Sequence, residues 1–356
     1  MNEYDAAIQY YHEAEIITNA VNDFNNLVII YNNMGMVYSH LAQYDQSLEL
    51  FRKAYKLFNK NIQPSSRSVT LNNIGGLYYN WGKIDSAAYY FNMAREIIYQ
   101  YGDQREMARM YNNRGGLYMQ ALEYQAALKA FQKAGQLFEQ QGEMSNLAAS
   151  CNNIGTIYQK WFRYDTALFY YDKALEIYNS LGEKSRIANV LNNKGVIFNE
   201  RQSYEKAEAA YQKALNIRKE LNEQEGIAST LSNLGAVYIE LEKYNKAIEC
   251  LTESVEILEK LRKTAKEEIR LDYHAKQIHI YQNLIICYIK NQQLSKAIHY
   301  CELSKSKFLI EQISGENQQI AIPGLKEIQA GLSPDAAVLL YATFDNPSLT
   351  QIVITQ

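Results

Sequence analysis

Residues 151–177 read CNNIGTIYQKWFRYDTALFYYDKALEI, and close copies of this stretch follow one another along the chain. The tetrad NNxG that opens at Asn152 returns every 40 residues, opening also at Asn32, Asn72, Asn112 and Asn192. Ser232-Asn233-x-Gly235 is a near copy, and Gln282-Asn283-Leu284-Ile285 is an irregular one after a longer gap. A fixed period of this length is typical of a solenoid, so the sequence predicts a stack of similar units.

Each repeat has the pattern of two packed helices. Counted from its glycine, Gly155, the quoted copy has an aromatic residue at +3 (Tyr158), a small residue at +12 (Ala167), a bulky one at +16 (Tyr171) and alanine at +19. The apolar residues keep helical spacing on both sides of a short break, which predicts helical hairpins. The breaks fall near Tyr44, Ile84, Tyr124, Tyr164, Tyr204 and Tyr244.

The recurring glycine predicts a close helix contact. Glycine costs about 1 kcal/mol relative to alanine inside a helix, so its return at one register indicates a steric need. We expect the small residues of the second helix to meet this face.

Glycine, tyrosine, small residue, aromatic and alanine fall in an order that resembles the tetratricopeptide repeat (TPR), in its long form of about 40 residues. The resemblance covers roughly residues 1–312. It implies an all-α fold, a right-handed TPR superhelix (α-solenoid). Residues 1–27 are predicted as the second helix of a truncated repeat and a linker. Residues 28–314 are predicted as seven repeats that start near 28, 68, 108, 148, 188, 228 and 278.

Composition favours a soluble protein and gives no sign of chemistry in the array. Hydrophobic residues make up 47% of the 356 residues, charged residues 21%, and the net charge is −3. This balance predicts neither a nucleic-acid-binding face nor a membrane span, and we expect a cytoplasmic location. Cys151, Cys250, Cys287 and Cys301 are predicted to be buried, reduced thiols in the helices. The five histidines are scattered, so no metal site and no cofactor are predicted.

The resemblance implies a binding site on the first helices, which line the concave surface of TPR arrays. It implies that the second asparagine of each pair faces this groove: Asn33, Asn73, Asn113, Asn153, Asn193, Asn233 and Asn283. An amide both donates and accepts hydrogen bonds, so this ladder could hold the main chain of an extended peptide or protein segment. Alternatively, each pair bonds to the next repeat and fixes the stacking. The two roles are compatible.

Further candidates for the groove are the first asparagines and three neighbouring side chains: Asn72, Asn112, Asn152, Asn192, Tyr79, Arg109 and Lys160. Family members that grip an acidic C-terminus use paired basic residues. Arg109 and Lys160 are the plausible equivalents, but they lie in different repeats. We therefore expect a neutral or mixed extended segment as the ligand.

The last residues, 315–356, change character and predict a short α/β segment. Ala337 to Phe344 and Gln351 to Thr355 have strand patterns around the turn Asp345-Asn346-Pro347. Residues 302–309, 325–332 and 335–341 resemble the entry into a CHAT domain, a caspase-like cysteine peptidase fold. That resemblance implies that the catalytic His and Cys would follow Gln356, so no catalytic residue is assigned and this stretch of chain is not expected to be an enzyme.

Two classes of function are compatible with these patterns. In the first, the array is the sensing or regulatory arm of a TPR-CHAT peptidase, with the downstream CHAT-like domain as its partner in cis. In the second, it is a stand-alone bacterial signalling adaptor or scaffold without peptidase chemistry. Both predict that these residues bind a protein or peptide.

Overall fold

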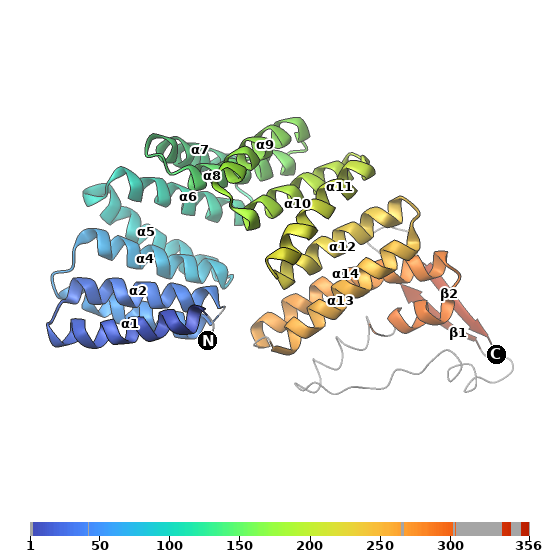
Figure 1. Ribbon diagram of the computed structural model, residues 1–356, viewed down its shortest axis with the longest axis horizontal. Coiled ribbons are helices and arrows are strands. Elements are labelled where there is room, and N and C mark those ends of the chain that lie inside the picture. Colours follow the sequence, from blue (N-terminus) through green and yellow to red (C-terminus); the bar gives the residue numbers. More distant parts are fainter. Residues whose placement is uncertain are drawn as a thin grey trace. The chain divides into compact units, whose positions relative to one another are not determined.

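The computed structural model describes residues 3–41, 43–264, 267–301, 303, 337–342 and 350–355. The chain divides into two compact units, Met1–Leu181 and Gly182–Gln356. Each unit is built from stacked helical hairpins, which confirms the predicted all-α repeat (Figure 1). The handedness of a superhelix stays a prediction.

Unit 1 begins with α1 and continues as four hairpins. In each hairpin the first helix packs against the second, and within the unit the second helix packs against the first helix of the next hairpin. The helices are α1 (Glu3–Ala20), α2 (Phe24–His40) with α3 (Tyr44–Lys56) and the short η1 (Leu57–Asn59), α4 (Pro64–Asn80) with α5 (Ile84–Tyr101), α6 (Gln104–Gln120) with α7 (Tyr124–Gln140), and α8 (Met144–Lys160) with α9 (Tyr164–Leu181).

Unit 2 has the same plan and ends with two strands. Its helices are α10 (Lys184–Glu200), α11 (Tyr204–Glu220), α12 (Gln224–Glu240), α13 (Tyr244–Thr264) and α14 (Glu267–Lys290), and residues 294–301 are also helical. Strands β1 (Ala337–Ala342) and β2 (Thr350–Thr355) pair antiparallel, with Ala337 opposite Thr355 and Ala342 opposite Thr350. The predicted strand hairpin is therefore present, but two strands alone do not establish an α/β domain. Residues 304–336 lie outside the described residues, and the CHAT assignment stays a prediction.

The turn inside each hairpin falls where the sequence predicts it. The second helices begin at Tyr44, Ile84, Tyr124, Tyr164, Tyr204 and Tyr244. In the turn after α6, Leu122 has a φ of 60° and the Glu123 N–H donates to the Tyr118 carbonyl at 2.8 Å. This left-handed residue ends the helix and reverses the chain. In the first six repeats the first helix begins four residues before the expected repeat start, at Phe24 against 28 in the first case, whereas α14 begins at Glu267, well before the expected start at 278.

The recurring glycine makes room for the second helix, and it meets a bulky side chain as well as the expected small residue. A Cβ at Gly155 would lie 2.7 Å from the Tyr171 ring, and one at Gly35 would lie 2.5 Å from the Phe51 ring. The glycine therefore receives the bulky residue sixteen positions later. The small residue at twelve also meets this face, since the Ser47 hydroxyl donates to the Gly35 carbonyl at 2.7 Å and a Cβ at Gly155 would lie 3.2 Å from the Ala167 carbonyl. The flat ring fills the space that a Cβ would occupy, which buries it without separating the helices.

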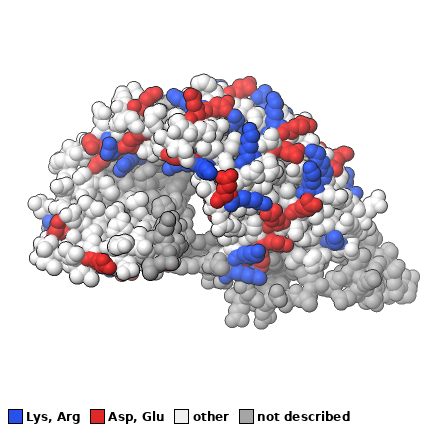
Figure 2. Space-filling model, in the orientation of Figure 1, with Lys and Arg blue, Asp and Glu red and all other residues white. Residues whose placement is uncertain are grey.

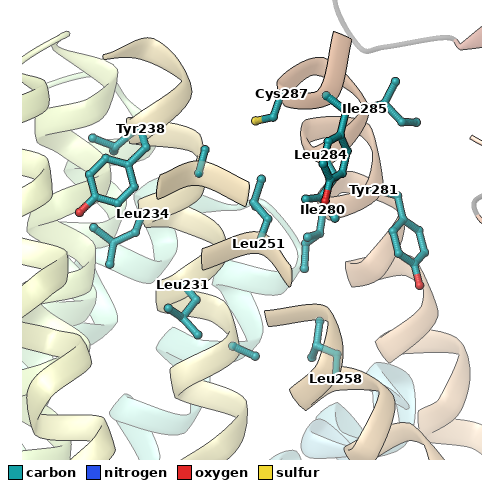
Figure 3. Packing of buried hydrophobic residues seen from close by; sticks show 14 of the residues in the cluster. Leu231, Leu234, Tyr238, Leu251, Leu258, Ile280, Tyr281, Leu284, Ile285 and Cys287 are labelled. Carbon is teal, nitrogen blue, oxygen red and sulfur yellow. The ribbon is translucent and has the colours of Figure 1, made fainter. Parts of the chain in front are cut away.

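Buried side chains join neighbouring hairpins within each unit. In unit 2, Leu231 and Leu234 of α12, Leu251 and Leu258 of α13, and Leu284 of α14 belong to one buried cluster (Figure 3). Each hairpin buries its apolar face against the next, as expected for a repeat whose units cannot form a core alone.

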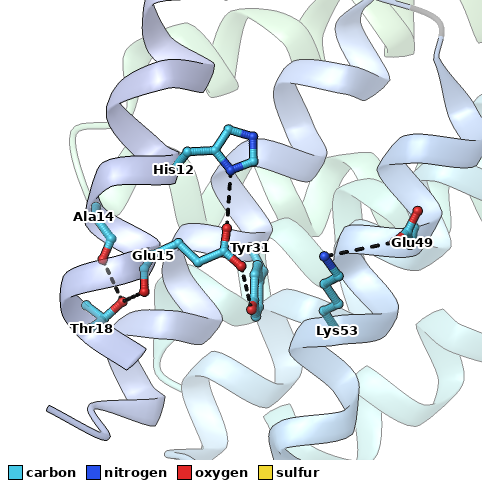
Figure 4. A network of polar contacts seen from close by, with 7 residues as sticks. All are labelled: His12, Ala14, Glu15, Thr18, Tyr31, Glu49 and Lys53. Atoms are coloured by element: carbon cyan, nitrogen blue, oxygen red, sulfur yellow. Dashed lines mark hydrogen bonds and ion pairs between the residues drawn. The ribbon is translucent and has the colours of Figure 1, made fainter. Parts of the chain in front are cut away.

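Polar contacts add to this packing at the start of unit 1. The Tyr31 hydroxyl of α2 donates to Glu15 of α1 at 2.9 Å, and His12 lies 3.3 Å from the same carboxylate (Figure 4). The Thr18 hydroxyl donates to the Ala14 carbonyl at 2.7 Å within α1. The Tyr31 to Glu15 contact fixes α1 against α2.

Candidate peptide-binding site

The asparagine pairs connect successive repeats. In unit 1 the Asn73 amide donates to Asn32 Oδ1 at 3.1 Å, and Asn32, which is buried, donates in turn to Thr70 Oγ1 at 2.8 Å. In unit 2 the Asn233 amide donates to Asn192 Oδ1, also at 3.1 Å. In these places the second asparagine of one repeat bonds to the first asparagine of the preceding repeat. This geometry supports the stacking role for both pairs.

The same asparagines also line cavities in unit 1. A cavity of about 310 Å³ is lined from α2, α3, α4 and α6, with Asn72, Asn73, Arg109 and Asn113 among its residues. A second cavity, of about 300 Å³, is lined from α4 to α8 and includes Tyr79, Asn112, Asn113 and Asn153. The two cavities share Gly76, Asn80 and Asn113, so they adjoin. The fold thus brings seven of the predicted residues of the first helices to the walls of two adjoining cavities, beside apolar side chains such as Phe51 and Phe131.

Asn113 is the central residue of this surface. It lines both cavities, it is half-buried, and among the described residues its side chain has no hydrogen-bond partner. Asn73, by contrast, uses one N–H for Asn32. A half-buried amide without a protein partner can bond both the N–H and the C=O of a peptide unit, so Asn113 is the position best placed to hold a main chain.

Two charged residues of α6 lie beside it in the first cavity. Asp103 caps α6, because its side chain accepts a hydrogen bond from the Glu106 N–H at 2.9 Å. Glu106 therefore lies in the first turn of the helix, and its carboxylate accepts a hydrogen bond from the Ser68 hydroxyl at 3.0 Å. Burial raises the pKa of Glu106, while the Ser68 hydrogen bond opposes that shift. Arg109 is one turn further along and exposed. The wall therefore presents amides with one acid and one base.

The remaining predicted residues lie elsewhere. Lys160 is exposed at the end of α8 and does not line these cavities. Arg109 and Lys160 thus do not line the same cavity. A further set is half-buried on the first helices without lining either unit 1 cavity: Asn33, Asn152, Asn192, Asn193 and Asn283.

Unit 2 has a larger cavity that the sequence reasoning did not anticipate. It measures about 550 Å³ and is lined by α10 to α14, with Asn233, Arg218, Glu223, Glu225 and His279 among its residues. Arg218 stands 23 residues after Gly195. The residues at this register in other repeats are apolar or aromatic: Phe58, Ile98, Phe138, Tyr178 and Leu258. Alignment on the glycine would have revealed this exception.

The face drawn in Figure 2 shows no concentration of one charge. Basic and acidic side chains are interspersed over the face drawn in Figure 2. No helix among the described residues is long and apolar enough to cross a membrane. Within the same residues, no three His, Cys, Asp or Glu side chains are grouped to hold a metal ion. None of the four cysteines forms a disulfide within the described residues. Cys151, Cys287 and Cys301 are buried as predicted, whereas Cys250 is only half-buried.

These repeats define a TPR protein. The tetratricopeptide repeat family model matches residues 26–100, 106–180 and 186–260, more than half of the chain, which therefore belongs to this family. No curated protein sequence shows a significant match.

Several solved structures share the fold at low sequence identity. The apo form of RapI is 19% identical with a TM-score of 0.63, covering 81% of this chain and 77% of its own. A Rap protein complexed with Competence and Sporulation Factor is 15% identical with a TM-score of 0.58, covering 87% and 97%. NprR in complex with its cognate peptide NprX is 17% identical with a TM-score of 0.57, covering 88% and 92%.

Proposed function

We propose that this chain is a peptide-binding TPR module of a signalling regulator, and that the adjoining cavities of unit 1 hold the main chain of an extended segment. The observation that carries the proposal is Asn113, a half-buried amide that lines both cavities and has no partner among the described residues. Asn73, Asn112 and Asn153 extend this surface over three repeats. Main-chain recognition by amides tolerates varied side chains, so the neighbouring residues would select the ligand.

The solved relatives support a regulatory peptide as ligand. NprR is seen with its cognate peptide NprX, and a Rap protein with Competence and Sporulation Factor. The present chain shares their fold at 15–17% identity, which leaves the ligand itself open. Binding without catalysis is part of this proposal.

The alternative, a sensing arm for a caspase-like peptidase, rests on sequence segments between residues 302 and 341. The family match ends at residue 260, and residues 304–336 lie outside the described part of the chain. The geometry of the cavities serves either context. A signalling adaptor is favoured because its support includes solved relatives of the same fold.

The test is Asn113→Ala, with Asn92→Ala as a matched control. Asn92 is exposed on α5, a second helix, so its loss removes an amide outside the proposed site. A randomised octapeptide library, N-acetylated and C-amidated, is captured on the purified protein, and the strongest binders are resynthesised for fluorescence anisotropy. We expect Asn113→Ala to weaken binding about tenfold, since two hydrogen bonds of about 0.5–1.5 kcal/mol each are lost.

Thermal unfolding separates binding from folding. Asn113 bonds to no described residue, so its alanine variant should melt with the parent. Unchanged binding in Asn113→Ala, or an equal loss in Asn92→Ala, would refute the proposed site. Failure of the wild-type protein to capture any peptide would refute the function.

A further inference from the structure

Arg218 is a buried cation at a core position of the repeat. Its side chain is only 6% exposed, and burial lowers the pKa of its guanidinium, an effect that nearby Glu223 opposes. Gly226 of α12 makes space for it, because a Cβ there would lie 2.9 Å from Arg218 Cδ and Nε. An arginine and a glycine in adjoining repeats thus replace what is elsewhere apolar packing.

The hydrogen bonds of Arg218 leave its charge without an anionic partner. Nη1 donates to the Gly226 carbonyl at 2.7 Å and to the Thr230 hydroxyl, and Nη2 donates to Asn189 Oδ1 at 2.7 Å. These acceptors are neutral. Nε is buried and has no hydrogen-bond partner among the described residues. A buried guanidinium normally faces a carboxylate, because desolvation of an unpaired charge is costly.

Arg262 shows the usual arrangement in the same unit. It is also 6% exposed, but its Nη2 and Nε contact the Glu259 carboxylate at 2.8 and 3.2 Å. The two arginines are therefore equally buried, but only Arg262 has a carboxylate that offsets the cost of burying its charge. Arg262 forms its ion pair within the fold, whereas Arg218 lines a cavity of about 550 Å³.

A purely structural role explains Arg218 less well. Its hydrogen bonds join α11 to α10 and α12, yet the acceptors of these bonds do not need Arg218 to satisfy their hydrogen-bonding capacity. The Thr230 hydroxyl and the Gly226 carbonyl already bond to each other at 2.9 Å, and Asn189 is exposed and can bond to water. An apolar residue fills this position in neighbouring repeats, so the stack does not require a charge there.

We propose that the unit 2 cavity is a subsite that binds a carboxylate of the peptide ligand through Arg218. This inference rests on the proposed peptide-binding function and names one chemical feature of the ligand. A guanidinium presents a planar set of N–H donors that matches a carboxylate. Asn233, which lines the same cavity, belongs to the asparagine ladder, so the subsite adjoins a residue type suited to the peptide main chain.

The acidic residues of the cavity add a second requirement. Glu223, Glu225 and His279 also line it. The carboxylates of Glu223 and Glu225 repel an anion in this cavity unless the ligand also has a positive charge. The favoured ligand thus has a carboxylate for Arg218 next to a basic group for Glu223 or Glu225, a mixed segment rather than an acidic one.

The experiment compares Arg218→Leu with Arg262→Leu in the full chain. The randomised octapeptide library is captured in two forms, one C-amidated and one with a free C-terminus, and bound peptides are sequenced by mass spectrometry. Enrichment of Asp or Glu in the amidated form assigns the carboxylate to a side chain. Enrichment that requires the free acid assigns it to the C-terminus.

Arg218→Leu should abolish the carboxylate preference and weaken the selected peptides at least about tenfold, as expected for a charged hydrogen bond. Its melting temperature should stay unchanged or rise, because a buried charge that no carboxylate hydrogen-bonds is removed. Arg262→Leu should lower the melting temperature, since it leaves Glu259 without its arginine, and should keep the preference. Arg218→Lys, which keeps the charge without the planar fork, should give an intermediate affinity.

Two results would overturn the subsite. One is peptide capture by the wild-type protein with no carboxylate preference. The other is a preference that persists in Arg218→Leu. In either case binding that still depends on Asn113 would leave the proposed function standing, whereas absence of all peptide capture would remove both.

Discussion

Gly75 and Gly76 are neighbours in α4, yet alanine at the two positions should change the free energy of unfolding in opposite directions. A Cβ at Gly75 would lie 2.7 Å from Cδ1 of Phe91 and 3.0 Å from its Cγ, and the ring is buried. A Cβ at Gly76 would meet nothing within 4 Å. Both glycines are inside the same helix, so the gain in helix propensity is common to both variants.

The difference between the variants isolates the packing contribution. Replacing glycine by alanine inside a helix stabilises by about 1 kcal/mol. Overpacking costs about 1–3 kcal/mol when a buried ring near its own backbone has to move. Gly76→Ala should therefore gain about 1 kcal/mol, and Gly75→Ala should lose up to about 2 kcal/mol.

Urea unfolding followed by circular dichroism measures both variants against the parent. Because the units of a solenoid unfold with limited cooperativity, hydrogen exchange of the α4 and α5 amides provides the local readout. Faster exchange in Gly75→Ala and slower exchange in Gly76→Ala are expected. Equal shifts of the same sign would show that the close contact with Phe91 does not set the helix spacing.

Two further predictions concern ionisable groups. Burial, with the hydrogen bond to Glu15, raises the pKa of Tyr31 to about 12. The stability that this shift contributes is present below the unfolded pKa of 10.0 and is lost as the pH rises through about 12. Tyr31→Phe should lower the free energy of unfolding by about 1 kcal/mol at neutral pH, because the hydrogen bond to Glu15 is lost. In thermal melts from about pH 9 to about pH 12 the variant should lose less stability than the parent. Parallel curves of melting temperature against pH would contradict this. Burial raises the pKa of Cys250 to about 11 and of Cys287 to about 12. Iodoacetamide at pH 8 should therefore leave both thiols unmodified in the folded protein and alkylate them in urea, as peptide mapping can follow; rapid native labelling would show that the helices open locally.

The repeat and its hairpins follow from the sequence because they depend on local chemistry. Helical spacing and the residues of the turns predict where Tyr124 or Tyr164 begins a second helix, and the structure agrees. Which side chain meets the glycine does not follow from spacing alone. The small residue and the bulky residue both lie on the facing helix and both meet the glycine. The relative rotation of the two helices places the Tyr171 ring closer to Gly155 than the Ala167 carbonyl.

The candidate site was predicted only in part. The asparagines were recognised by their recurrence, but in the structure the recurring asparagines have different neighbours and different hydrogen bonds. Asn32 and Asn73 bond to each other, whereas Asn113 lines two cavities without a partner among the described residues. Recurrence gives identical residues an identical role, so it cannot distinguish them. The contacts differ because neighbouring side chains differ, Thr70 beside Asn32 being one example.

By itself, the sequence determined the period, the helical hairpins and the family, since these come from the residues within about 40 positions of one another. Only the tertiary structure decided how side chains from different repeats combine. Alignment on the glycine shows Arg218 at a register that is apolar or aromatic elsewhere, but its burial beside Gly226 depends on how α11 and α12 pack. Cavities and buried charges arise from contacts between helices, where distance along the chain no longer measures distance in space.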